Sequence, residues 1–168
     1  MKIAVYPGSF DPITLGHLDI IERSCRLFDL LYVGVLVNQE KRVPLFSCAE
    51  RVEMLSNATA HLPNVRCEFF SGLLAAYARQ RQAVAIVRGM RAVSDFEYEF
   101  KLAAANRHLA PHIETVFMMT SHEYSFISSQ IVKEVAELGG SVQGWVPDDV
   151  ARRLEQRFAI YKGAGPDK

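Results

Sequence analysis

Short apolar runs alternate along the chain with longer segments in which apolar residues recur every three or four positions. Runs that are apolar at successive positions are typical of strands covered on both faces of a sheet. We predict strands at Ile3–Tyr6, Leu30–Val37, Val65–Phe69, Val84–Val87 and Thr115–Met119, and several of them are apolar at successive positions. The helical period predicts helices at Gly16–Phe28, Ser47–His61, Leu73–Arg81, Asp95–Leu109, Ser128–Leu138 and from Pro147 onward.

The strict alternation of strands and helices indicates the fold class. A strand, a crossover helix and the next strand form a right-handed βαβ unit, and a series of such units builds a parallel sheet. We therefore predict an α/β fold, a single doubly wound, Rossmann-like domain with a five-stranded parallel sheet. We expect this domain to span residues 1–160 and to be followed by a disordered tail at residues 161–168.

The composition narrows the class of protein. The formal net charge is zero, which argues against a nucleic-acid binder but is compatible with a small anionic ligand. No apolar run approaches the roughly 20 residues of a membrane span, and the N-terminus lacks the long apolar region of a signal peptide. Three cysteines without a CxxC pair predict reduced thiols. We therefore expect a cytoplasmic protein with no nucleic-acid or membrane partner.

The segment after the first strand, YPGSFDPITLGH, is the first place to search for function, because ligands of such sheets bind beyond the carboxyl ends of the strands. The segment has no GxGxxG, and the chain has no GxxxxGKS or GxxxxGKT. Gly8 and Ser9 can bring backbone N–H groups close to an anion. Gly16 and His17 open a helix, where free N–H groups and the helix dipole favour phosphate. The alternative is a helix-capping Thr14 with His17 at the surface.

The segments after the second and third strands carry weaker signals. Lys41 and Arg42 follow the second strand, where a basic pair is either solvated or, beside a phosphate loop, an anion clamp. Gly72, Leu73 and Leu74 follow the third strand and are most simply the start of a helix with core leucines. Their place at the same sheet edge is what suggests a ligand contact.

Two arginines follow the fourth strand. Arg88 and Arg91 flank Gly89, which lets the backbone turn sharply. Two guanidinium groups at a strand exit suit phosphate, because each offers a planar fork of donors. The alternative for these arginines is a salt bridge to Glu97 or Glu99.

Two serines follow the fifth strand. Ser128 and Ser129 precede a helix, and a serine at that place is first of all an N-cap. With Lys133 one turn further on, they could also hold the outer phosphates of a nucleotide. His108 and His112 have the spacing of metal ligands, but a proline between them breaks any helix, and we predict no metal site.

Four of the five strand exits thus offer groups suited to anionic oxygen, and the sequence shows no plausible nucleophile–base pair. These groups are His17, Lys41, Arg88 with Arg91, and Ser128 with Ser129. A site of donors without a covalent nucleophile suits phosphoryl or nucleotidyl transfer, which proceeds by positioning and charge stabilisation.

Three stretches carry a family resemblance: YPGSFDPITLGH, RGMRAVSDFEYEF and FISSQIVKEVA. With them, the chain from about Met1 to Phe158 closely resembles the bacterial phosphopantetheine adenylyltransferases, a branch of the nucleotidyltransferase superfamily with (H/T)xGH and ISSTxxR-like motifs. The resemblance implies direct in-line transfer of an adenylyl group from ATP to 4′-phosphopantetheine, giving dephospho-coenzyme A and pyrophosphate. It also implies Mg²⁺ that arrives with ATP and assembly as a homohexamer.

The resemblance further implies roles for the matching residues. His17 would stabilise charge on the α-phosphate, Lys41 would orient the attacking phosphate, and Arg91 and Ser129 would contact the phosphates of ATP, so these four are the implied catalytic residues. Residues implied to bind phosphopantetheine are Ser9, Lys41, Leu73, Leu74 and Arg88. Residues implied to bind ATP are Ser9, Phe10, Thr14, His17, Gly89, Met90, Arg91, Glu99, Tyr124, Ser125, Phe126, Ile127, Ser128, Ser129 and Gln130.

The chain departs from the family pattern at two places. The family often has N-P-x-K-x-P after the second strand, where this chain has NQEKRVP, so either Lys41 or Arg42 takes the role of the lysine. Gln130 stands where the family commonly has Ser or Thr.

The alternative functions are a sister nucleotidyltransferase acting on a pyridine or flavin mononucleotide, a non-catalytic nucleotide-binding domain, and a flavodoxin-like electron carrier. The stretch RGMRAVSDFEYEF favours the pantetheine branch.

Overall fold

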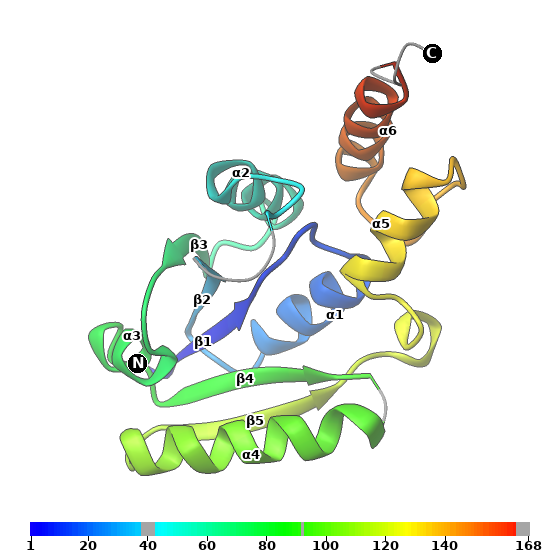
Figure 1. Cartoon of the computed structure of the whole chain (residues 1–168). Coiled ribbons are helices and arrows are strands. Elements are labelled where there is room, and N and C mark those ends of the chain that lie inside the picture. The colour runs from blue at the N-terminus through cyan, green and yellow to red at the C-terminus, as the bar shows by residue number, and fades with distance from the viewer. Residues whose placement is uncertain (38–42, 92, 164–168) are drawn as a thin grey trace.

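The computed structural model describes residues 1–37, 43–91 and 93–163 of the chain (Figure 1). The strands are β1 (Ile3–Gly8), β2 (Leu30–Leu36), β3 (Val65–Phe70), β4 (Ala85–Met90) and β5 (Glu114–Met119). The helices are α1 (Leu15–Ser24), α2 (Cys48–Ala58), α3 (Leu74–Gln80), α4 (Val93–Leu109), the short 3₁₀ helix η1 (His122–Tyr124), α5 (Ser129–Glu137) and α6 (Asp148–Gly163).

The strands form one five-stranded parallel sheet in the order β3-β2-β1-β4-β5. The first two crossovers carry the chain outward from β1 to β3, and the third returns it to the other side of β1, where β4 pairs with β1. The sheet therefore changes its direction of winding between β1 and β4. This confirms the predicted α/β, doubly wound, Rossmann-like fold, and a crevice at such a reversal is where these sheets bind ligands.

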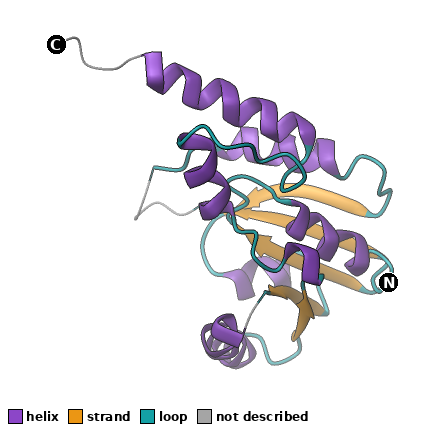
Figure 2. Cartoon of the chain, turned by 90° about the vertical axis from the view of Figure 1, so that its right-hand side faces the viewer, coloured by secondary structure: helices purple, strands orange, loops and turns teal. Residues whose placement is uncertain are grey.

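Helices cover both faces of the sheet (Figure 2). Along β1, Ala4 and Tyr6 belong to one apolar cluster, and Ile3 and Val5 belong to the other. Residues of α1, α2, α5 and α6 pack in the first cluster, and residues of α3 pack in the second. Because β1 is buried on both faces, it appears in the sequence as a continuous apolar run.

One predicted strand boundary was wrong in a way that matters for function. The fourth strand does not end at Val87 but continues to Met90, so Arg88 and Gly89 lie within β4 and not on the loop after it. Both residues pair with β5 across the sheet. The side chain of Arg88 is therefore positioned by a strand buried within the sheet, which is a more rigid support than a loop.

The last helix extends further than expected. α6 continues to Gly163, beyond residue 160, where the domain was predicted to end. Residues 164–168, most of the predicted tail, lie outside the described residues. None of the helices in the described part of the chain combines the length and the apolar character that crossing a membrane requires.

Candidate active site

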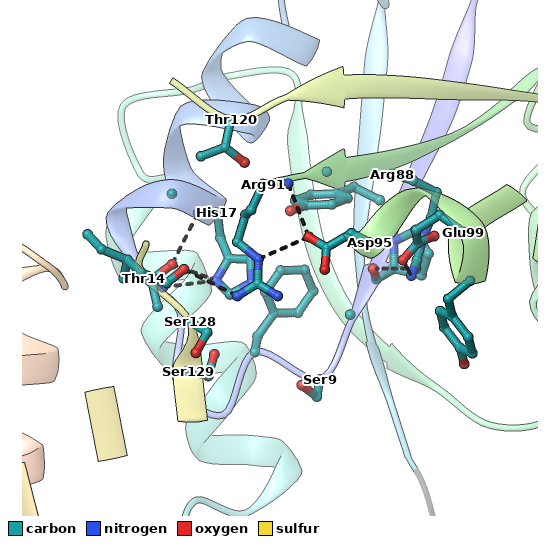
Figure 3. A pocket seen from close by; sticks show the side chains of 18 residues that line it. Ser9, Thr14, His17, Arg88, Arg91, Asp95, Glu99, Thr120, Ser128 and Ser129 are labelled. Atoms are coloured by element: carbon teal, nitrogen blue, oxygen red, sulfur yellow. Dashed lines mark hydrogen bonds and ion pairs between the residues drawn. The ribbon is translucent and has the colours of Figure 1, made fainter. Parts of the chain in front are cut away.

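A cleft of about 420 Å³ opens beyond the carboxyl ends of β1 and β4, where the sheet changes its direction of winding (Figure 3). The residues that line it are Tyr6, Pro7, Gly8, Ser9, Phe10, Thr14, Gly16, His17, Arg88, Gly89, Arg91, Asp95, Tyr98, Glu99, Thr120, Ile127, Ser128 and Ser129. They come from the end of β1, the loop that follows it, the start of α1, the end of β4, the start of α4 and the segment from the end of β5 to the start of α5. The structure thus brings the exits of three strands into one site.

His17 is held in one orientation by the start of α1. The backbone N–H of Thr14 donates to Nδ1 of His17 at 3.0 Å, and the Thr14 hydroxyl accepts from the backbone N–H of His17 at 3.3 Å. Thr14 therefore caps the helix, as the alternative interpretation expected, but His17 takes part in the same capping box and also lines the cleft. Because Nδ1 accepts a hydrogen bond, the neutral ring carries its proton on Nε2, which is left as a donor.

Burial and the positive charge of Arg91 lower the pKa of His17 to about 4. We expect His17 to remain neutral down to about this pH, and an NMR titration of ¹⁵N-labelled histidine, with the signal assigned from a His17→Gln variant, measures it. The unfolded chain binds the proton near 6.5, so falling pH destabilises the folded state between the two values and not above them. A His17 signal that titrates near 6.5 would contradict this arrangement.

Phe10 supports the other side of the His17 ring. Its backbone has a φ of 46°, in the left-handed region, and its side chain is 1% exposed. The Phe10 ring meets the rings of Tyr6 and His17 edge-on, at centroid distances of 5.4 and 5.1 Å. A Cβ on Gly8 would lie 2.9 Å from this ring, so glycine at position 8 leaves room for Phe10. Phe10 therefore contributes to the site by packing against the rings of Tyr6 and His17, and not through a polar side chain.

Arg88 and Glu99 form a two-point ion pair inside the cleft. Nε and Nη2 of Arg88 donate to the two carboxylate oxygens of Glu99, both at 2.6 Å, and Nη1 donates to the carbonyl of Pro7 at 3.3 Å. Although burial lowers the pKa of Arg88, the hydrogen bonds and charge of Glu99 raise it above its ordinary value. The salt bridge considered as the alternative is therefore present for Arg88, within the cleft rather than away from it.

Arg91 is paired differently. Its Nε lies 3.5 Å from Oδ2 of Asp95, and its Nη1 donates to the carbonyl of Ile127 at 3.4 Å. Both contacts are long and the Arg91 side chain is 42% exposed, so its guanidinium can turn toward an anion in the cleft at little cost. Arg91 is thus more available to a ligand than Arg88.

The two serines after β5 line the cleft, whereas Lys133, considered with them as a possible phosphate contact, does not. The Ser128 hydroxyl accepts from the N–H of Ile131 at 3.1 Å and caps α5, as expected for a serine at a helix start. The Ser129 hydroxyl donates to the carbonyl of Pro12 at 2.7 Å. Lys133 does not line the cleft, because its ammonium group is paired with Asp11 at 2.8 Å.

Some residues implied to bind substrate lie away from this cleft. Leu73 is exposed before α3, and Leu74 packs against the apolar cluster on that face of the sheet. Gln130 donates to Glu134 on the surface of α5. The others that do not line the cleft are Met90, Tyr124, Ser125 and Phe126. Lys41, and its alternative Arg42, lie outside the described residues.

Four lining residues were not singled out from the sequence: Tyr6, Pro7, Asp95 and Thr120. Thr120 directly follows Met119, where both the predicted strand and β5 end, so it is the first residue to which the strand-exit rule applies. Asp95 lies four residues after Arg91, a helical spacing that suits an ion pair. Tyr6 had no such signal, because it lies inside an apolar strand.

The chemistry that this cleft supports is charge stabilisation by fixed donors. Thr14 lies beside His17 as a nucleophile would lie beside its base, but the Thr14 side chain is 1% exposed and is occupied as a helix cap. Within the described part of the chain, no group of three or more His, Cys, Asp or Glu side chains could hold a metal ion.

Known proteins match this chain over most of its length. The cytidylyltransferase-like family model matches residues 5–135. The chain is 59% identical over 155 residues to a phosphopantetheine adenylyltransferase of Synechococcus elongatus, covering 92% of this chain and 93% of that protein. This chain belongs to the phosphopantetheine adenylyltransferase family. It is also 53% identical over 158 residues to the family member of Caldanaerobacter subterraneus subsp. tengcongensis, covering 94% of this chain and 98% of that one.

A solved structure supports the fold assignment. A protein of Vibrio parahaemolyticus, provisionally assigned as a nicotinate-nucleotide adenylyltransferase, superposes with a TM-score of 0.67. The alignment covers 92% of this chain and 99% of the other, with 19% sequence identity. At this identity the similarity concerns the fold, and it agrees with the Rossmann-like sheet described above.

Proposed function

We propose that this protein transfers the adenylyl group of ATP to the phosphate of 4′-phosphopantetheine, giving dephospho-coenzyme A and pyrophosphate. The observation that carries the proposal is the cleft at the sheet reversal, in which the TxGH histidine is held neutral with Nε2–H as its free donor. Membership of the phosphopantetheine adenylyltransferase family supports the choice of acceptor.

The reaction that suits this cleft is direct in-line displacement at the α-phosphorus. A phosphate oxygen of the acceptor attacks, the bond from the α-phosphorus to the bridging oxygen breaks, and pyrophosphate leaves. A phosphate monoester is already a competent nucleophile near neutral pH, so the protein needs no strong general base. His17 would donate from Nε2 to a non-bridging oxygen of the α-phosphate, where negative charge grows in the transition state.

The remaining residues are assigned to one substrate or the other. Arg91 and the start of α5 at Ser129 would face the phosphates of ATP, and Arg88, fixed by Glu99, would face the acceptor. Ser9 would lie between the substrates. Lys41, which lies outside the described residues, is proposed to orient the acceptor phosphate.

Mg²⁺ is proposed to enter with the nucleotide. The two carboxylates that line the cleft are Asp95 and Glu99, and each is engaged by an arginine. This donor set fits an ion held by the triphosphate oxygens and by water better than an ion held in a protein cage. Bound in this way, the ion would neutralise charge on the departing pyrophosphate.

A homohexamer and a cytoplasmic location are the remaining parts of the proposal. Large apolar side chains are exposed along α4 and at the end of β5: Phe96, Phe100, Leu109 and Met119. Phe96 and Phe100 stack with their ring centroids 5.8 Å apart. Exposed apolar side chains of this kind suit burial against a second copy. The free thiols of Cys25, Cys48 and Cys67 suit a reducing compartment.

Pyrophosphate release from ATP tests the function. The purified protein is assayed with 4′-phosphopantetheine and, in parallel, with nicotinate mononucleotide and flavin mononucleotide as rival acceptors. We expect release with phosphopantetheine alone. Release with a rival acceptor alone would support adenylyl transfer but contradict phosphopantetheine as the acceptor. No release with any acceptor would favour a non-catalytic nucleotide-binding domain.

A further inference from the structure

The Asp11 carboxylate is buried, and the proposed mechanism assigns it no role. Its Oδ1 accepts from the backbone N–H of Phe46 at 2.9 Å, and its Oδ2 accepts from the backbone N–H of Leu45 at 3.0 Å. Nζ of Lys133 donates to the same Oδ2 at 2.8 Å. The Asp11 residue is 6% exposed, and neither Asp11 nor Lys133 lines the cleft. One buried carboxylate thus receives three hydrogen bonds beside the cleft but outside it.

These hydrogen bonds join the exits of three different strands. Asp11 lies in the loop between β1 and α1, Leu45 and Phe46 lie between β2 and α2, and Lys133 lies in α5, which follows β5. The loop that contains Asp11 also carries Ser9 and leads to Thr14 and His17. The position of Asp11 therefore bears on the groups that face both proposed substrates.

The same loop is held at two more points. The Ser129 hydroxyl donates to the carbonyl of Pro12 at 2.7 Å, from the first turn of α5. Nη1 of Arg51, in α2, donates to the carbonyl of Ser9 at 2.7 Å, and Arg51 is 4% exposed. The loop is thus fixed from the α2 side and from the α5 side, with Asp11 between them.

We propose that Asp11 and Lys133 act as a positioning pair for adenylyl transfer, by holding the loop after β1 against α5 and against the segment that leads into α2. This inference rests on the proposed function. In-line displacement requires aligned reacting atoms, and a displacement of about 1 Å costs about 100-fold in rate. Charge-assisted hydrogen bonds to a buried carboxylate are short and directional, so they limit such a displacement.

Four single variants and one double variant test the pair. Lys133→Met removes the ammonium group and keeps the length of the side chain, whereas Lys133→Arg keeps the charge. Asp11→Asn removes the carboxylate, alone or together with Lys133→Met. Arg153→Met is the matched control, because Arg153 pairs with Glu53 at 2.7 Å and its side chain is 28% exposed, against 32% for Lys133. For each variant, kcat, both KM values and the melting temperature are measured.

We expect Lys133→Met to lower kcat by about tenfold, with both KM values within about threefold of wild type, because alignment is lost rather than binding. Lys133→Arg and Arg153→Met should retain the wild-type kcat. Asp11→Asn should lower kcat by about 100-fold, and the double variant should lose no more than Asp11→Asn alone. Any of three results would overturn the proposal. Lys133→Met could have the same kcat as Arg153→Met, the losses in kcat of the two single variants could multiply in the double variant, or Lys133→Met could change KM alone.

A second measurement, amide hydrogen exchange, tests the contacts of Asp11 independently of adenylyl-transfer activity. Hydrogen exchange at the Leu45 and Phe46 amides should be at least about tenfold faster in Asp11→Asn than in wild type or in Arg153→Met, because each amide loses its charged acceptor. Unchanged exchange would overturn the inference even in an active enzyme. Faster exchange in Asp11→Asn, together with a wild-type protein that fails to transfer adenylyl groups, would overturn the proposed function and leave the contacts of Asp11 confirmed.

Discussion

His17→Ala is expected to lower kcat by about 100- to 1,000-fold, the usual effect of removing one fixed donor that stabilises transition-state charge. The imidazole is held with Nδ1 as an acceptor and Nε2 as a donor, so in the proposed mechanism its main contact would form with charge that grows during the reaction. ATP affinity, measured by calorimetry, is expected to stay within about threefold, because a neutral ring adds little to ground-state binding of a polyanion.

His61→Ala is the control for this variant. His61 contacts Glu22 on the surface and takes no part in the cleft, so its removal should leave kcat unchanged. An ATP affinity that falls as far as kcat would show that His17 serves binding rather than the transition state. A kcat that stays at the wild-type value would remove His17 from the mechanism.

Arg88→Ala is expected to raise the KM for phosphopantetheine more than the KM for ATP and also to destabilise the fold. The guanidinium lies between Glu99 and the carbonyl of Pro7, at the end of β1, and its removal leaves the Glu99 carboxylate buried without its cation. Loss of one partner of a buried ion pair costs about 3 kcal/mol or more. Urea unfolding and the two KM values measure the two effects separately.

Arg81→Ala provides a matched control for Arg88→Ala. Arg81, which directly follows α3, makes the same two-point contact with Glu68 of β3, at 2.5 and 2.9 Å, and neither residue lines the cleft. We expect it to lower the free energy of unfolding without changing either KM. Equal increases in both KM values for Arg88→Ala would contradict its assignment to the acceptor side.

The sequence was sufficient for the fold class and for the approximate positions of the strands. β1 and β2 are apolar at nearly every position, whereas β3 carries Arg66 and Glu68. All five strands were located by short apolar runs that alternate with helical segments. The start of α2 was also predictable, because Ser47 and Glu50 form a capping box through contacts only three residues apart. Such local signals depend on spacing in the chain and not on the rest of the fold.

The location of the candidate site could be predicted from the sequence, but many of the contacts between its residues could not. The strand-exit rule found His17, Arg91 and Ser128 because the ends of parallel strands converge at one edge of the sheet. It did not predict the pairing of Lys133 with Asp11, which lies 122 residues away in the sequence. A pairing over that distance depends on how α5 packs against the loop after β1, which no spacing rule contains.

The protonation of His17 illustrates the same limit. A TxGH motif suggests a histidine at a helix start, and Thr14 can be recognised as its cap. The low pKa, however, arises from burial and from Arg91, which approaches the cleft from beyond β4. The neutral tautomer, on which the proposed mechanism depends, therefore follows from the tertiary structure.

The most direct test of direct adenylyl transfer is a single-turnover reaction of the wild-type protein with ATP and 4′-phosphopantetheine, followed by mass spectrometry of both the small molecules and the protein. The account predicts that dephospho-coenzyme A and pyrophosphate appear together in equal amounts while the mass of the protein stays unchanged. Pyrophosphate that appears before dephospho-coenzyme A, with protein heavier by one adenylyl group, would contradict it.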